Sequence, residues 1–170
     1  MLVAMLRSPG RSRTLTGQVG EYLVAAELAR RGLIATTFTS NVPYYDIVAS
    51  DARGRHVSVQ VKTSNSDTWQ FRVDNFCAIT FRGKRQVIGR PVREPVLRLV
   101  VVLVQLGERD RFYVCSWKAL RKIVIRGHRA WLDKHGGRRP KNPESLHVSV
   151  SERSIRRFEG DWARVQSQLR

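Results

Sequence analysis

The chain has 170 residues, of which 42% are hydrophobic, so it is long enough for one domain with a buried core and gives no case for two. Its 31 Lys and Arg stand against 14 Asp and Glu, for a formal net charge of +17. Such an excess indicates a polyanionic partner, with nucleic acid as the leading candidate. A merely solubilising basic surface is the weaker alternative, because such surfaces usually mix both signs.

The apolar segments argue against a membrane protein and a secreted one. Residues 96–106 are strongly apolar but are interrupted by Arg98, and they have about half the length that a bilayer requires. Residues 1–6 are too short for the core of a signal peptide and have their basic neighbours on the wrong side. Cys77 and Cys115 lie far apart in apolar contexts without zinc spacing, so we expect buried thiols. The sequence therefore predicts a cytoplasmic protein.

We expect a basic arm over residues 1–16, followed by a single domain over 17–170 that begins with a helix. Apolar residues keep helical spacing over 17–31, and Gly32 is a typical helix end. The strands expected in the whole chain share β-branched or aromatic residues between turn signals, and lie at 33–39, 44–50, 56–63, 69–73, 77–81, 97–106, 111–115 and 147–150. Gly and Pro among basic residues predict a mobile loop over 82–95.

Two further helices are expected in the second half. Ser116 is a good N-cap for a helix with apolar residues on one face over 117–124, and a Gly- and Arg-rich loop is expected over 128–143. Ser151 is expected to cap a final helix that runs to Leu169. The order of helix, several strands, helix, strand and helix indicates an α/β (mixed α+β) fold.

Residues 44–63 gather side chains suited to phosphodiester hydrolysis. Asp46 lies in an apolar strand, and Gln60 and Lys62 share one face of the next strand because strand side chains alternate. A carboxylate can hold a divalent cation beside a Lys that orients and activates water. The apolar neighbours of Asp46 favour a functional role over simple exposure. Lys62 alone is equally consistent with a solvated strand end.

A helix with Glu21, followed by Asp46 and by Gln60-Val61-Lys62, resembles the PD-(D/E)XK nuclease superfamily. The form is a Gln-x-Lys variant, similar to Mrr-type restriction endonucleases, Holliday junction resolvases and intron-encoded homing endonucleases of this fold. Pro43 stands three residues before Asp46 rather than next to it, and Gln60 replaces the second acid. The resemblance covers residues 17–64 closely. It implies a restriction-endonuclease-like core, with a central mixed β-sheet flanked by helices.

The resemblance also implies a DNA endonuclease dependent on Mg²⁺ or Mn²⁺, with a role for each site residue. Asp46 would ligate the metal, Gln60 would give its amide oxygen or orient a water, and Val61 would offer its carbonyl. Lys62 would position the attacking water and steady the charge that develops on the phosphate. Glu21 would bind the metal through water or hold Lys62, although a helix dipole favours an acid there in any case. Gln in place of Glu removes one negative charge, so weaker metal binding is expected.

The remaining expectations concern partners. The residues predicted to contact nucleic acid are basic and clustered, namely Arg82, Lys84, Arg85, Arg90, Arg93, Lys118, Arg121 and Lys122. Residues 64–69 either meet backbone phosphates, with Trp69 stacking on a base, or form a simple turn. A homodimer or higher homo-oligomer would provide two sites for two strands. The alternatives are a catalytically inactive DNA-binding protein on the same fold and a basic protein that binds RNA.

Overall fold

The computed structural model describes residues 13–38 and 42–169, so most of the predicted basic arm lies outside the described residues. A five-stranded mixed sheet forms the centre, in the strand order β1-β2-β3-β7-β8. Its strands are β1 (Ile34–Thr37), β2 (Ile47–Ser50), β3 (His56–Ser64), β7 (Val100–Gln105) and β8 (Arg111–Ser116). Only the β3–β7 pair is parallel. The expectation of a central mixed sheet is therefore confirmed.

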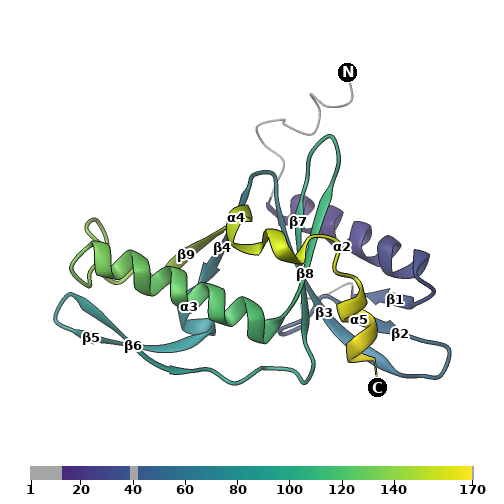
Figure 1. The fold of residues 1–170 in the computed structure, drawn as a ribbon, viewed down its shortest axis with the longest axis horizontal. Helices are drawn as coiled ribbons and strands as arrows, with labels where there is room; N and C mark the ends of the chain where they lie inside the picture. The colour runs from purple at the N-terminus through teal and green to yellow at the C-terminus, as the bar shows by residue number, and fades with distance from the viewer. Residues whose placement is uncertain (1–12, 39–41, 170) are drawn as a thin grey trace.

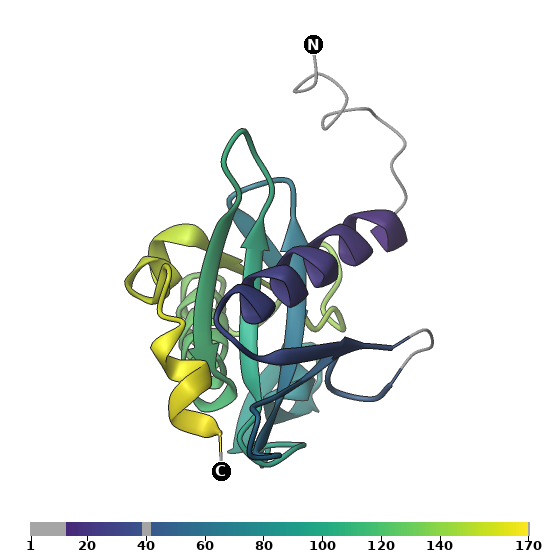
Figure 2. The same ribbon diagram turned by 90° about the vertical axis from the view of Figure 1, so that its right-hand side faces the viewer.

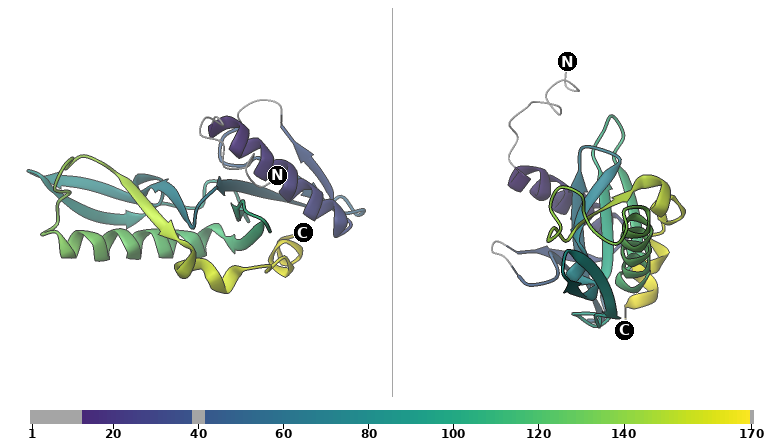
Figure 3. Two further views of the ribbon diagram at one scale, coloured as in Figure 1. Left: turned by 90° about the horizontal axis from the view of Figure 1, so that it is seen from above. Right: turned by 90° about the vertical axis from the view of Figure 1, so that its left-hand side faces the viewer.

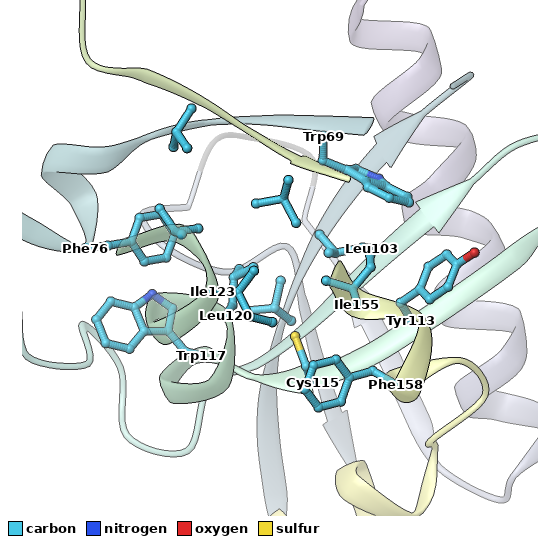
Figure 4. Packing of buried hydrophobic residues seen from close by; sticks show 14 of the residues in the cluster. Trp69, Phe76, Leu103, Tyr113, Cys115, Trp117, Leu120, Ile123, Ile155 and Phe158 are labelled. Carbon is cyan, nitrogen blue, oxygen red and sulfur yellow. The ribbon is translucent and has the colours of Figure 1, made fainter. Parts of the chain in front are cut away.

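Helices cover both faces of this sheet because its inner strands are apolar on both sides. The helix α2 (Arg13–Arg30), which begins four residues earlier than predicted, lies across one face (Figure 2). There Val24 and Leu28 pack with Val57 and Val59 of β3. The other face is covered by α3 (Trp117–Lys134) and by a ribbon of β4 (Thr68–Arg72) and β9 (His147–Ser151). Figure 4 shows the aromatic core on this side. No helix in the described ranges has the length and apolarity needed to span a membrane.

The prediction of a mobile loop over 82–95 is wrong, because most of this segment forms a strand. β5 (Cys77–Arg82) and β6 (Arg85–Pro91) are an antiparallel hairpin that follows a short 3-10 helix, η1 (Val73–Asn75). Gly83, with a φ of 58°, begins the tight turn between the paired residues Arg82 and Arg85. A turn of this length requires positive φ, so the glycine marks a hairpin here and not a loop. The hairpin and α3 extend together to one side of the sheet (Figures 1 and 3).

The expected loop over 128–143 is also only partly correct, since α3 continues to Lys134. Ser116 caps the helix as predicted, accepting a hydrogen bond from the Ala119 N–H at 3.2 Å. His128 and Leu132 extend the buried stripe of the helix. His128 fits this stripe because its Nε2 is hydrogen-bonded to the Gln86 Oε1 of β6 at 2.9 Å. His128 is thus a polar residue in the buried stripe of α3, and its hydrogen-bond partner lies in the hairpin.

The predicted final helix is broken into α4 (Glu152–Ile155), the 3-10 helix η2 (Arg156–Phe158) and α5 (Ala163–Gln168). The break lies at Gly160, where φ is 64° and the N–H donates to the Phe112 carbonyl of β8 at 2.8 Å. Phe158 packs into the core on one face of the sheet, and Trp162 packs into the core on the other face. The segment therefore wraps around the edge strand β8, which a straight helix cannot do.

Helix α2 approaches β3 most closely at Gly20. A Cβ atom built on Gly20 would lie 1.8 Å from the Thr63 Oγ1, so only glycine allows this approach. The contact fixes the height of α2 over β3 and with it the position of the next residue, Glu21. Gly17, one turn earlier on the same helix, has no heavy atom within 4 Å of a built Cβ.

Gly20→Ala is expected to lower the free energy of unfolding by about 1–3 kcal/mol, because the added methyl group overpacks this contact. Gly17→Ala, the matched control, should stabilise the protein by about 0.5–1 kcal/mol because alanine is the better helix former. Adding Thr63→Ala to Gly20→Ala should recover part of the loss by removing the Oγ1. Urea denaturation of the variants measures these differences. Equal stability of the two Gly→Ala variants would show that α2 does not contact Thr63 closely at Gly20.

Candidate active site

Asp46 lies where β2 ceases to pair with β3. Its backbone N–H donates to the Val59 carbonyl at 2.9 Å, and its Oδ2 accepts a hydrogen bond from the Val61 N–H at 2.7 Å. The register of the strand pair ends with Ile47 opposite Val59, and the Asp46 N–H reaches the same Val59 carbonyl instead of continuing the pairing to Gln60. These two hydrogen bonds place Asp46 beside residues 59–61 of β3, next to the predicted site residues Gln60 and Lys62. The Asp46 carboxylate thus accepts the hydrogen bond from the Val61 N–H that a continued β2 backbone would otherwise have accepted.

The environment of Asp46 disfavours its ionised form. Burial raises the pKa of this carboxyl above its ordinary value, and this effect outweighs the opposing effects of the Val61 N–H and of the Lys62 charge. The Lys62 charge is thus near enough to favour the ionised carboxylate, but its effect is smaller than that of burial. A partly buried acid of this kind gains from a bound cation.

Glu21 comes to the same place from α2. Burial raises the pKa of its carboxyl, and the negative charge of Asp46 raises this pKa further. The fold thus brings the two predicted acids within electrostatic reach of each other from segments that are 25 residues apart in the sequence. Two neighbouring carboxyls with raised pKa values resist ionising together, and a divalent cation between them would relieve that repulsion.

The donor atoms at this point fit a hard divalent cation, because all of them are oxygens. Asp46 and Glu21 offer carboxylates, and Gln60, which lines the neighbouring pocket, carries an amide oxygen. The Val61 N–H points to the edge held by Asp46, and the carbonyl of the same strand residue faces the same edge. Within residues 13–38 and 42–169 no group of three or more His, Cys, Asp or Glu could hold a metal ion. A cation here would depend on this mixed set and on water.

A pocket of about 790 Å³ opens on the Gln60 and Lys62 side of the site. Lys62 is exposed, and Tyr44 also lines the pocket, although no sequence pattern singled out that residue. Trp69, by contrast, is 1% exposed and its Nε1 donates to the Val104 carbonyl at 3.1 Å. The suggestion that Trp69 stacks on a base is therefore wrong.

The basic residues predicted to contact nucleic acid do not form one patch. Arg82, Lys84 and Arg85 are exposed at the tip of the β5–β6 hairpin. Two exposed lysines, Lys118 and Lys122, follow the outer side of α3, Arg90 is exposed on β6, and Arg93 lines the pocket beside Lys62.

Arg121 differs from the rest of this set because the protein itself engages its guanidinium. The side chain donates to the Val92 carbonyl at 2.5 Å and lies 5.1 Å above the centre of the Trp117 ring. Arg121 therefore holds the segment after β6 against α3.

No protein-family model and no curated protein sequence matches this chain. Its structure is similar to that of a bacterial homing endonuclease, I-Ssp6803I, with a TM-score of 0.54 and 15% identity over 93% of this chain and 95% of that one. A Holliday junction resolvase, Hjc of Archaeoglobus fulgidus, is less similar, with a TM-score of 0.44 and 14% identity over 82% and 87% of the two chains. The chain has a restriction-endonuclease-like fold, and the predicted resemblance to PD-(D/E)XK nucleases is confirmed at the level of the fold.

Asp46→Asn is expected to raise the melting temperature of the metal-free protein at pH 7. Both acids have pKa values raised above the ordinary 3.8 and 4.5, so the folded state holds protons that the unfolded chain has released. Stability therefore falls as the pH rises from these ordinary values through the raised ones. The Asn side chain stays neutral while its oxygen still accepts from the Val61 N–H.

Thermal melts from pH 4 to pH 7, with and without Mg²⁺ or Mn²⁺, measure this effect. The parent protein should gain stability when metal is added at pH 7, and Asp46→Asn should gain less. Asp133→Asn removes an exposed acid of α3 and serves as the matched control. A lower melting temperature for Asp46→Asn than for the parent in the metal-free protein would show that the carboxylate is not under this constraint.

Proposed function

We propose that this protein is a metal-dependent DNA endonuclease, a hydrolase of the PD-(D/E)XK type. The observation that carries the proposal is the meeting of two carboxyls with raised pKa values, Glu21 and Asp46, beside the charge of Lys62. This arrangement occurs on a restriction-endonuclease-like fold, at the open end of a strand pair. Charge alone would favour any polyanion, whereas these groups favour hydrolysis of a phosphodiester.

The proposed roles follow from the position of each group. Asp46 ligates the cation with the carboxylate oxygen that the Val61 N–H leaves available, and Glu21 ligates it directly or through water. Gln60 and the Val61 carbonyl complete the protein's oxygen donors. When bound, Mg²⁺ or Mn²⁺ would polarise the phosphate and acidify a bound water. Lys62, exposed at the mouth of the pocket, orients the attacking water and stabilises the charge that develops on the phosphate.

DNA is the proposed substrate because the charge distribution suits an extended phosphate backbone. The hairpin tip with Arg82, Lys84 and Arg85 lies away from the sheet, so a bound duplex would meet the protein at two separated places, the tip and the site (Figure 3). Arginine forks suit phosphate oxygens. Cutting both strands takes two sites, so we expect a homodimer or a higher homo-oligomer in the active form.

The second candidate is a DNA-binding protein on the same fold that does not cleave. Gln60 favours it, because an amide in place of a carboxylate leaves the site with one negative charge fewer and lowers its affinity for metal. A third candidate, a protein that binds RNA, depends on the net charge alone. Cleavage that requires metal and Lys62 would exclude both.

The parent protein should nick supercoiled plasmid or cleave a labelled duplex or four-way junction in Mg²⁺ or Mn²⁺. Lys62→Ala and Asp46→Ala should each lower the cleavage rate by about 100-fold or more, because both remove groups that act on the transition state. Binding of the same DNA, measured by fluorescence anisotropy in EDTA, should change little. Gel assays under single-turnover conditions give the rates.

Arg30→Ala is the matched control for the lost positive charge. Arg30 is exposed at the end of α2, roughly 13 Å further along the helix axis than Glu21, and pairs with Glu27 at 3.3 Å. Its rate should equal that of the parent. Tight DNA binding by the parent with no cleavage in either metal would support the inactive DNA-binding protein instead. Tighter binding of RNA than of DNA would favour the third candidate.

The hairpin tip is expected to contact DNA through phosphates alone. Replacing Arg82, Lys84 and Arg85 together with alanine should weaken binding to all DNA sequences alike. The slope of log affinity against log salt should become shallower by about 3, since each phosphate contact contributes about 0.9. Titrations between 50 and 200 mM salt, roughly the range over which such contacts weaken, measure the slope. An unchanged slope would remove the hairpin tip from the DNA interface.

A further inference from the structure

The pocket beside the site lies where a substrate must pass. Gln60 and Lys62 line its wall, and both belong to the proposed active site. Its volume of about 790 Å³ falls within the roughly 300–1,000 Å³ that is typical of sites for small organic groups. A group that fills this pocket would therefore lie next to the phosphate held at Lys62.

Tyr44 lines this pocket from a backbone conformation that is unfavourable for a tyrosine. Its φ is 75°, in the left-handed region where a bulky residue is strained. The side chain is 59% exposed, so burial does not offset the strain. The neighbouring Tyr45 packs edge-on against Phe38, with ring centres 5.6 Å apart. The loop is thus held by Tyr45, whereas Tyr44 lines the pocket.

The rest of the lining mixes aromatic, cationic and neutral polar side chains, among them the exposed Asn75 and His147. Arg93 is exposed, whereas Phe71 is half-buried and Trp117 is only 4% exposed. The two carboxylates of the lining are already engaged in the protein. Asp74 accepts from the Arg72 guanidinium at 2.7 Å, and Glu94 accepts from the Leu99 N–H at 2.9 Å. The exposed Tyr44 ring beside Lys62 and Arg93 fits a nucleobase together with its phosphate.

We propose that this pocket receives an unpaired nucleotide of DNA next to the scissile phosphate, with the Tyr44 ring stacked on its base. This inference rests on the proposed function in that DNA is the ligand. A paired base lies inside the duplex stack and cannot enter a pocket. The preferred substrate is therefore DNA with an unpaired nucleotide, at a flap, a bulge or a branch, and not a continuous duplex.

The test uses the full chain and two DNA probes of one sequence, a continuous duplex and a duplex with one unpaired 2-aminopurine nucleotide. Affinities are measured in EDTA, so binding is separated from cleavage. The parent protein should bind the unpaired probe more tightly. Tyr44→Ala should reduce this preference roughly 5- to 100-fold, the range expected for loss of one base–aromatic stack, and Tyr44→Phe should keep it. Tyr22→Ala, which removes a 60% exposed tyrosine of α2, is the matched control and should keep it as well.

Tyr44→Gly adds a readout that a purely structural role would not give. Glycine adopts a φ of 75° without strain, so this variant should melt at a higher temperature than the parent while losing the preference for the unpaired probe. Lower stability of Tyr44→Gly together with the loss of binding would show that Tyr44 supports the loop instead, and would overturn the inference. Loss of the preference in Tyr44→Phe would replace stacking with a hydroxyl contact and overturn it too.

The inference and the proposed function fail in different ways. Cleavage that depends on Lys62 but is equal on paired and unpaired DNA, with equal affinities, would leave the nuclease and overturn the pocket assignment. A preference for the unpaired probe that depends on Tyr44, in a protein that cleaves nothing with either metal, would leave the pocket assignment and overturn the nuclease.

Discussion

The hydrogen bond from the Val61 N–H to the Asp46 carboxylate is the contact on which the site depends. β3 pairs with β2 on one side and with β7 on the other. β2 begins only at Ile47, so Asp46 and the residues before it are not part of the strand. The aspartate side chain takes over the edge that the missing strand residues would have occupied. The Asp46 carboxylate is thereby held against β3 at Val61, between Gln60 and Lys62. Every other feature of the site is positioned relative to this point.

The same arrangement costs stability. Two carboxyls are held partly buried and close together, with raised pKa values, and a tyrosine is held at positive φ without burial of its ring. Unfavourable burial of charge and strained backbone both cluster where a protein binds or reacts, because the surrounding fold can support them. For Glu21, that support comes from the packing of α2 on β3 at the neighbouring Gly20. The departures from an optimally stable fold therefore point to the same few residues.

A separate polar cluster holds the basic hairpin against α3 and the loop that follows it. Gln86 is 6% exposed, and its amide donates to the carbonyls of Pro143 and Ser145 while its oxygen meets the ring of His128. Burial, together with the charge of Arg139, lowers the pKa of His128 to about 4, so the ring is neutral at physiological pH. A neutral, fully buried ring keeps β6 on α3 without a change of charge. The hairpin is thus tied by hydrogen bonds to α3 and to the loop after it.

The sequence by itself determined the features that rest on short-range patterns. Alternation along β3, the turn between β2 and β3 and the N-cap at Ser116 are local, and they were enough to predict the strand pair, the helix start and the shared face of Gln60 and Lys62. Only the tertiary structure decided where Gln86 and Phe158 pack, that Trp69 is buried and that Tyr44 faces a pocket. These outcomes depend on partners distant in sequence, such as His128, which lies 42 residues from Gln86. A local sequence pattern indicates whether a residue is buried. Which residue it contacts is decided only by the tertiary packing of segments that are distant in the sequence.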